Sequence, residues 1–249
     1  MTSLKFGTDG WRGIIAGDFT FANARTVAAA IARYVVRGED ARKGVLVGYD
    51  HRYASDTVAA AVAEVISSTG TPVWLADKPC PTPAISLLVR QRQAAGGLVI
   101  TASHNPYSWN GIKYKASYGS SALPSIVAQI ESELEGVVSN GVPPLPPRKD
   151  LIHRLEPRAP YLDTIEKLID WQRLRDAKFR FVVDPMHGSA AGLLRELFQR
   201  NGVVCDEIRG TRDPRFGGVH PEPIEPHIEA LRKAVRAGKY DAGLAADGD

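Results

Sequence analysis

Short apolar runs alternate with helix-like patterns along most of the chain. Residues 44–50 (GVLVGYD), 72–76 (PVWLA) and 96–101 (GGLVIT) are apolar runs typical of buried strands. Residues 21–37 carry apolar side chains at helical spacing and are followed by Gly38, and a second helix is predicted to begin with Ser55 as its cap. This alternation of strand and helix predicts a mostly parallel sheet covered by helices on both faces.

The same alternation returns in the second half of the chain. A stretch with four prolines, 140–150 (NGVPPLPPRKD), is typical of a stiff linker and divides the chain into predicted domains 1–145 and 146–249. Beyond it we predict helices over 160–175, 190–200 and 225–237, and strands over 179–184, 203–208 and 240–247. The predicted fold class is therefore α/β, with two consecutive α/β/α domains whose sheets are mixed but mostly parallel.

Composition narrows the class of protein. Apolar residues make up 44% of the 249 residues, charged residues 24%, and the net charge of +3 comes from interspersed charges. Because no basic run and no bilayer-length apolar stretch is present, we expect neither a nucleic-acid nor a membrane partner. Cys80 and Cys205 are far apart and match no metal or redox spacing, which indicates a reducing, cytoplasmic location. An anionic small-molecule substrate remains compatible with these numbers.

The candidate chemistry gathers in residues 101–115, TASHNPYSWNGIKYK. This segment follows the predicted strand 96–101, and ligands of open α/β sheets bind at such carboxyl ends. Asn110-Gly111 predicts a hairpin turn that would return Lys113 toward Ser103. Adjacent Ser103 and His104 do not form a hydrolase triad, which needs its histidine opposite the nucleophile. From these residues alone, the segment is either a solvated surface loop or the site of a phosphate-carrying serine.

TASHNP followed by NGIK resembles the phosphoserine loop of the α-D-phosphohexomutases, the phosphoglucomutase and phosphomannomutase family. The resemblance implies that Ser103 carries a phosphoryl group, that His104 supports it, and that Lys113 is a candidate general acid/base or phosphate partner. FGTDGWRG (6–13) resembles the N-terminal signature of this family, which implies that Arg12 reaches the active site, where it could hold a phosphate bidentately. GYDHR (48–52) is a weaker match, and its Asp and Arg could instead form a structural ion pair.

Two further matches concern the second domain. DGD (247–249) resembles the start of the family's metal loop, which implies a Mg²⁺ site made by Asp247, Asp249 and the Ser103 oxygen; hard oxygen donors suit this ion. DPMHGSA (184–190) and GGVHPEP (217–223) resemble other family loops. We expect His187 to be structural and assign His220 no role.

The resemblance implies an isomerase of carbohydrate metabolism that interconverts hexose 1-phosphate and hexose 6-phosphate through a phosphoserine and a bisphosphorylated sugar. Glucose and mannose phosphates, with their 1,6-bisphosphates, are the expected small-molecule partners, and Trp11 and the TAS opening favour them over glucosamine phosphate. The match corresponds to the first half of a four-domain enzyme, so we expect an inactive fragment that lacks the C-terminal domains. The alternatives are a phosphoglucosamine mutase, a non-catalytic phosphosugar-binding module, and a phosphatase with Asp247 as nucleophile.

Overall fold

The computed structural model describes residues 4–7 and 10–249, so Thr8 and Asp9 of the FGTDGWRG motif lie outside the described residues. The chain forms two units. Unit 1 consists of residues 1–50, 54–102 and 108–157, and unit 2 of residues 51–53, 103–107 and 158–249. Unit 2 therefore includes two short segments that lie far from its main part in the sequence. None of the helices formed by the described residues is both long and apolar enough to cross a bilayer.

Unit 1 is built on a six-stranded mixed sheet with the strand order β1-β5-β4-β2-β3-β6. The strands are β1 (Trp11–Ile14), β2 (Val45–Tyr49), β3 (Val73–Ala76), β4 (Gly96–Ile100), β5 (Trp109–Ala116) and β6 (Ile152–Leu155). Strands β4, β2, β3 and β6 are parallel, whereas β5 is antiparallel to both β4 and β1. The prediction of a mixed, mostly parallel sheet is confirmed.

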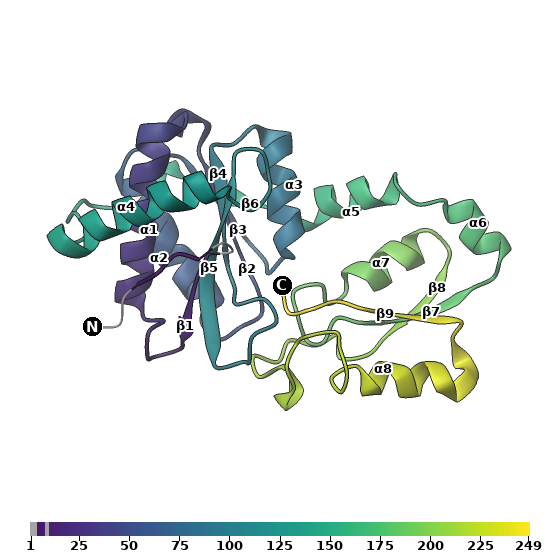
Figure 1. Ribbon diagram of the computed structural model, residues 1–249. Coiled ribbons are helices and arrows are strands. Elements are labelled where there is room, and N and C mark those ends of the chain that lie inside the picture. Colours follow the sequence, from purple (N-terminus) through teal and green to yellow (C-terminus); the bar gives the residue numbers. More distant parts are fainter. Residues whose placement is uncertain (1–3, 8–9) are drawn as a thin grey trace. The chain divides into compact units, whose positions relative to one another are not determined.

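Helices cover both faces of this sheet (Figure 1). They are α1 (Phe21–Gly38), α2 (Ser55–Ser68), α3 (Thr82–Arg92) and α4 (Pro124–Asn140), with short 3₁₀ turns at Ala41–Lys43 and Lys149–Leu151. On one face, Ile85 of α3 closely approaches Gly48 and Gly97, where any larger side chain would collide with it. On the other face, Tyr34 of α1 packs edge to face against Tyr114 of β5. The result is the expected α/β/α layering.

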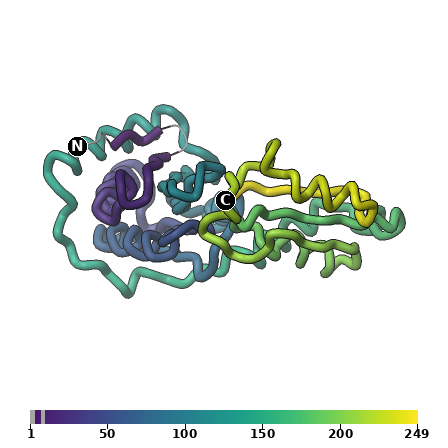
Figure 2. Tube along the Cα trace, turned by 90° about the horizontal axis from the view of Figure 1, so that it is seen from below, coloured from purple at the N-terminus to yellow at the C-terminus, as the bar shows by residue number. Residues whose placement is uncertain are grey.

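The proline-rich stretch is a connection within unit 1. Residues 141–148 form neither helix nor strand, and Figure 2 shows them as an extended length of chain passing around unit 1. They lead from α4 to β6, which pairs with β3 in parallel, Val73 lying opposite Ile152. Because β6 completes the first sheet, unit 1 continues to Pro157, and residues 146–157 lie in unit 1.

Unit 2 has a three-stranded parallel sheet with the order β8-β7-β9. Its strands are β7 (Arg180–Asp184), β8 (Val204–Glu207) and β9 (Ala242–Ala245), and its helices are α5 (Arg158–Glu166), α6 (Trp171–Asp176), α7 (Leu193–Arg200) and α8 (Glu229–Ala234). A 3₁₀ turn spans Phe216–Gly218, and a π-helical turn, Val235–Lys239, follows α8. Side chains of α5, α6 and α7 pack with β7 and β8 into one apolar core that contains Trp171, Phe181 and Phe198. On the β9 strand, Leu231 of α8 closely approaches Gly243.

Two local predictions in unit 1 are wrong. Asn110 and Gly111 lie inside β5 and make no turn, because the buried Asn110 amide donates to the Ser55 hydroxyl and Gly111 lies against the carbonyls of Trp11 and Thr101. Ser55 is the first residue of α2 and is not its cap. The cap position belongs to Ala54, whose φ is 59°.

Candidate active site

Ser103 lies in the loop that follows β4, on the part of the chain that belongs to unit 2. Its φ of 55° places it in the left-handed region, which a residue other than glycine or asparagine seldom occupies. The side chain is only 7% exposed. Such a backbone persists only where its surroundings impose it, and it is found preferentially at functional sites. The side chain of Arg52 makes some of the contacts that hold this backbone conformation.

The guanidinium group of Arg52 holds the Ser103 loop. Its Nη2 donates to the carbonyls of Ser103 at 2.6 Å and Asn105 at 2.7 Å, and its Nη1 donates to the carbonyl of Pro106 at 2.8 Å. The same group lies 4.9 Å from the ring centre of Phe216, an arrangement that favours a cation. Arg52 is 0% exposed. Because the guanidinium group is planar and has several donors in fixed positions, it can donate hydrogen bonds to several neighbouring backbone carbonyls at once.

The sequence was compatible with a structural ion pair between Asp50 and Arg52. In the structure these two side chains hold different parts of the fold. In unit 1, Asp50 is 1% exposed and accepts hydrogen bonds from the hydroxyls of Ser55 at 2.8 Å and Thr101 at 2.7 Å. The end of β2, the start of α2 and the end of β4 are thereby tied together. Arg52, two residues later, holds the loop in unit 2. The sequence contains no signal for this division of roles.

Asp247 lies within hydrogen-bonding distance of the predicted phosphoserine. The Ser103 hydroxyl donates to Asp247 Oδ2 at 3.1 Å, although the two residues are 144 positions apart in the sequence. Asp247 follows β9, as expected for a residue at the carboxyl end of a parallel strand. The structure therefore brings together the first two of the predicted metal ligands, and Asp249 follows two residues later along the same segment.

The backbone of the Asp-Gly-Asp segment is fixed on several sides. Gly248 donates its N–H to the carbonyl of Pro221 at 3.1 Å, and its carbonyl accepts from the N–H of Ser189 at 3.2 Å. A Cβ atom at Gly248 would lie 2.8 Å from the carbonyl oxygen of Ser103, closer than such atoms are found in proteins. Gly188 approaches the carbonyl of Asp247 in the same way. Glycine is required at position 248 because the serine loop passes directly against it.

His51 and His187 support this region as structural residues. His51 Nδ1 lies 2.9 Å from the carbonyl of His187, so that nitrogen carries the proton. Burial lowers the pKa of His51 below its usual value, and the charges of Arg212 and Arg158 lower it further, against the opposing effect of the hydrogen bond. His187 Nδ1 in turn lies 2.8 Å from the carbonyl of Thr211. Each ring is held by a backbone carbonyl, which agrees with the structural role expected for His187.

Arg12 and Lys113, the other predicted catalytic residues, lie on neighbouring strands of unit 1. Arg12 of β1 pairs with Gly111 of β5, so Lys113, two residues further along β5, is its diagonal neighbour on the same face of the sheet. Diagonal neighbours are about 7–8 Å apart, within reach of long side chains. Gly10 allows this approach: its φ is 101°, and a Cβ there would lie 2.2 Å from the carbonyl of Ile112. Lys113 is 6% exposed.

His104 is exposed, unlike Ser103 beside it. Two oxygen donors lie together here, the Ser103 hydroxyl and the Asp247 carboxylate, and the chain carries a further carboxylate, that of Asp249, two residues on. This set fits a hard divalent cation such as Mg²⁺, which prefers one or two carboxylates and keeps several waters. The residues that the structure gathers around Ser103 could thus hold both a phosphoryl group and the cation that neutralises it.

The candidate site thus consists of a serine with a left-handed backbone, held by Arg52 beside an aspartate at a strand end. The family models for phosphoglucomutase/phosphomannomutase match here, α/β/α domain I over residues 3–140 and domain II over residues 159–249. The chain belongs to the phosphoglucomutase/phosphomannomutase family. The resemblance of its motifs to the α-D-phosphohexomutases is confirmed.

Individual relatives agree with this assignment. Curated relatives named phosphoglucosamine mutase include those of Caldicellulosiruptor saccharolyticus, 30% identical over 98% of this chain and 53% of the relative, and of Delftia acidovorans, 34% identical over 100% and 54%. A provisionally assigned phosphomannomutase from Thermus thermophilus has a similar structure, with a TM-score of 0.85 and 32% identity over 100% of this chain and 56% of that one. The chain spans about half the length of the curated relatives it matches.

Proposed function

We propose that the protein takes part in the interconversion of hexose 1-phosphate and hexose 6-phosphate, with Ser103 as the residue that carries phosphate. In this reaction phosphoserine gives its phosphoryl group to a sugar phosphate, and the resulting bisphosphate returns its other phosphate to the serine. The supporting observation is the Ser103 hydroxyl itself, held on a left-handed backbone by Arg52 and 3.1 Å from Asp247. An ordinary surface serine needs no such support.

The proposed cation site consists of Asp247, Asp249 and an oxygen of Ser103. When bound, Mg²⁺ would neutralise charge that spreads over the equatorial oxygens of the transferring phosphoryl group. Asp247 and Asp249 carry carboxylates on alternate residues, and the hydrogen bonds of Gly248 fix the backbone between them. Both features support this assignment. The phosphatase alternative requires Asp247 to act as a nucleophile. Here the Asp247 carboxylate accepts a hydrogen bond from the Ser103 hydroxyl, which gives that alternative no support.

Arg12 and Lys113 are the proposed partners of the phosphoryl group. Arg12 would bind phosphate oxygens through its planar fork of donors, and Lys113, its diagonal neighbour, would act as general acid and base toward the sugar hydroxyl. His104, which follows Ser103, is proposed to support the phosphoserine from the exposed side of the loop.

The preferred sugar has two candidates. The sequence favours glucose and mannose phosphates, and the structural similarity to the Thermus thermophilus protein supports this choice. The names of the curated relatives support glucosamine phosphate instead. We propose glucose or mannose phosphate as the substrate and glucosamine phosphate as the second candidate, in a cytoplasmic protein. The two cysteines are buried free thiols, which is compatible with that location.

Mass spectrometry tests the role of Ser103. In a chain extended to the length of the relatives, we expect one added phosphate at Ser103 after incubation with glucose 1,6-bisphosphate and Mg²⁺, and none in Ser103→Ala. Ser108→Ala removes an exposed serine of the same loop and should still be phosphorylated. Phosphate at another serine, or none at all, would refute the assignment.

Turnover tests the remaining roles. Because the chain is about half as long as its relatives, the coupled assay compares it with a chain extended to their length. We expect background activity from the 249 residues and clear activity from the extended chain, with the preferred sugar decided by kcat/KM for glucose, mannose and glucosamine phosphates.

In the extended chain, Arg12→Lys should lower kcat/KM, since one ammonium cannot replace a bidentate fork. Lys113→Met should lower kcat more. Near-normal rates in both variants would show that neither residue acts on the phosphoryl group.

A further inference from the structure

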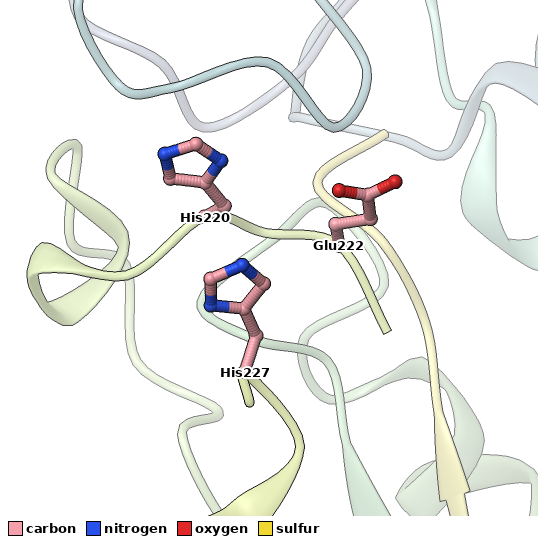
Figure 3. Close-up of side chains that lie close together, drawn as sticks. All are labelled: His220, Glu222 and His227. Atoms are coloured by element: carbon pink, nitrogen blue, oxygen red, sulfur yellow. The ribbon is translucent and has the colours of Figure 1, made fainter. Parts of the chain in front are cut away.

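We propose that His220, Glu222 and His227 form a binding site for a late first-row transition metal, with Zn²⁺ as its typical occupant. One ligand atom from each side chain lies within 4.8 Å of the other two. Figure 3 shows the two imidazole rings one above the other with the carboxylate of Glu222 beside them. This inference does not depend on the proposed mutase activity, and it involves none of the residues assigned to Mg²⁺.

The backbone brings these three side chains together before any metal binds. Pro221, between the first two, is buried and accepts a hydrogen bond from the N–H of Gly248 at 3.1 Å. The chain then turns back: the N–H of Ile224 donates to the carbonyl of Glu222, and that of His227 donates to the carbonyl of Ile224, each at 2.8 Å. Because proline restricts φ and the turn is closed by hydrogen bonds, little order has to be created on binding.

The rings of His220 and His227 are arranged as a pair of nitrogen donors. Their centres lie 5.1 Å apart, and their planes are inclined by only 15°. Each neutral imidazole ring offers one nitrogen lone pair to a metal. The carboxylate of Glu222 adds an anionic oxygen, and all three side chains are at least partly exposed. A metal ion can therefore enter and keep water as a further ligand.

The chemistry of the donors selects the metal. Two imidazole nitrogens and one carboxylate oxygen suit Zn²⁺, which binds such sets with a water in the fourth position, whereas Mg²⁺ prefers oxygen alone. At Zn–ligand distances of about 2.0–2.1 Å, tetrahedral ligands lie about 3.3 Å apart. The separations of up to 4.8 Å must close by roughly 1.5 Å, which rotation about the side-chain bonds of these at least partly exposed residues can supply.

Co²⁺ is the first probe, since its visible absorption reports nitrogen ligation and low coordination number. The 249-residue chain is titrated with Co²⁺ and then Zn²⁺, with millimolar Mg²⁺ present to occupy the oxygen site. We expect one Co²⁺ equivalent with visible bands that Zn²⁺ abolishes, and Zn²⁺ binding by calorimetry with a Kd below about 10 μM. His227→Gln and Glu222→Gln should each weaken Zn²⁺ binding at least tenfold, with circular dichroism showing that both variants are folded.

Two control variants make the test specific. His153→Gln removes an exposed histidine of unit 1 and should leave Zn²⁺ binding unchanged. Asp247→Asn removes a ligand of the proposed Mg²⁺ site and should also leave it unchanged. Loss of Zn²⁺ binding in Asp247→Asn, unaltered binding in folded His227→Gln, or absence of the Co²⁺ bands would overturn the proposal.

Discussion

Replacement of Arg52 tests how much this side chain contributes to the order of the serine loop. Arg52→Met retains most of the apolar stem but removes the donors to the carbonyls of Ser103, Asn105 and Pro106. The Ser103 bond is buried and the other two are partly buried, and a buried carbonyl that loses its partner costs about 1–3 kcal/mol. Because the freed loop can open toward water, we take the lower end, which gives about 3 kcal/mol for three carbonyls. The loop should become mobile while both units stay folded.

Hydrogen exchange of the peptide 101–108 measures this effect. A loss of about 3 kcal/mol corresponds to roughly 100-fold faster exchange, since about 1.4 kcal/mol is a factor of ten. In Arg52→Lys, a single ammonium can still serve some of the carbonyls, so we expect an intermediate increase. Arg42→Met is the matched control, because the side chain of Arg42 is 92% exposed and pairs with Asp40 at the surface. Exchange in Arg52→Met within threefold of the wild type would refute the argument.

Three further predictions concern stability. Gly248→Ala should destabilise unit 2 by about 1–3 kcal/mol in urea unfolding, since its Cβ would meet the Ser103 carbonyl at 2.8 Å. Gly136→Ala in α4, where the added Cβ meets the Arg33 guanidinium at an ordinary 3.6 Å, should not destabilise. Leu197→Ala should cost about 2–5 kcal/mol because the side chain is 0% exposed, and an unchanged urea midpoint would contradict this. The pKa of His51 is lower in the folded protein than in the unfolded chain, so the unfolded chain binds a proton at a higher pH than the folded protein does. The free energy of unfolding should therefore decrease as the pH falls below about 6.5. His51→Gln should reduce this loss, and an identical pH dependence would exclude His51 as its source.

The apolar strands could be predicted because burial imposes a visible pattern. Residues 44–50 and 96–101 contain β2 and β4, whose residues are all buried. The edge strands β1 and β6 lack that pattern, since Arg12, His153 and Arg154 stand within them. Their places in the sheet depend on pairing with β5 and β3, which a local pattern does not reveal.

The proximity of Ser103 and Asp247 could be predicted from the sequence, whereas the contacts that support the serine loop could not. Ser103 and Asp247 could be found as a serine after one strand and an aspartate after another, and they do lie together. The contacts that Arg52 makes with this loop could not be predicted, because its partners are backbone carbonyls, which every sequence contains. The turn expected at Asn110 failed for a related reason: a buried hydrogen bond to Ser55 outweighs the local preference of Asn-Gly.

The discontinuity of unit 2 has a consequence for the order in which the protein is made. Residues 103–107 leave the ribosome long before Asp247 and Gly248, which are their partners in unit 2. At about 5–20 residues per second, the 144 residues between Ser103 and Asp247 take roughly 7–30 seconds to synthesise. During that interval Ser103 lacks its hydrogen bond to Asp247 and its close contact with Gly248. The hydrogen bond between Ser103 and Asp247 therefore forms late, once an aspartate 144 positions further along the chain has been added.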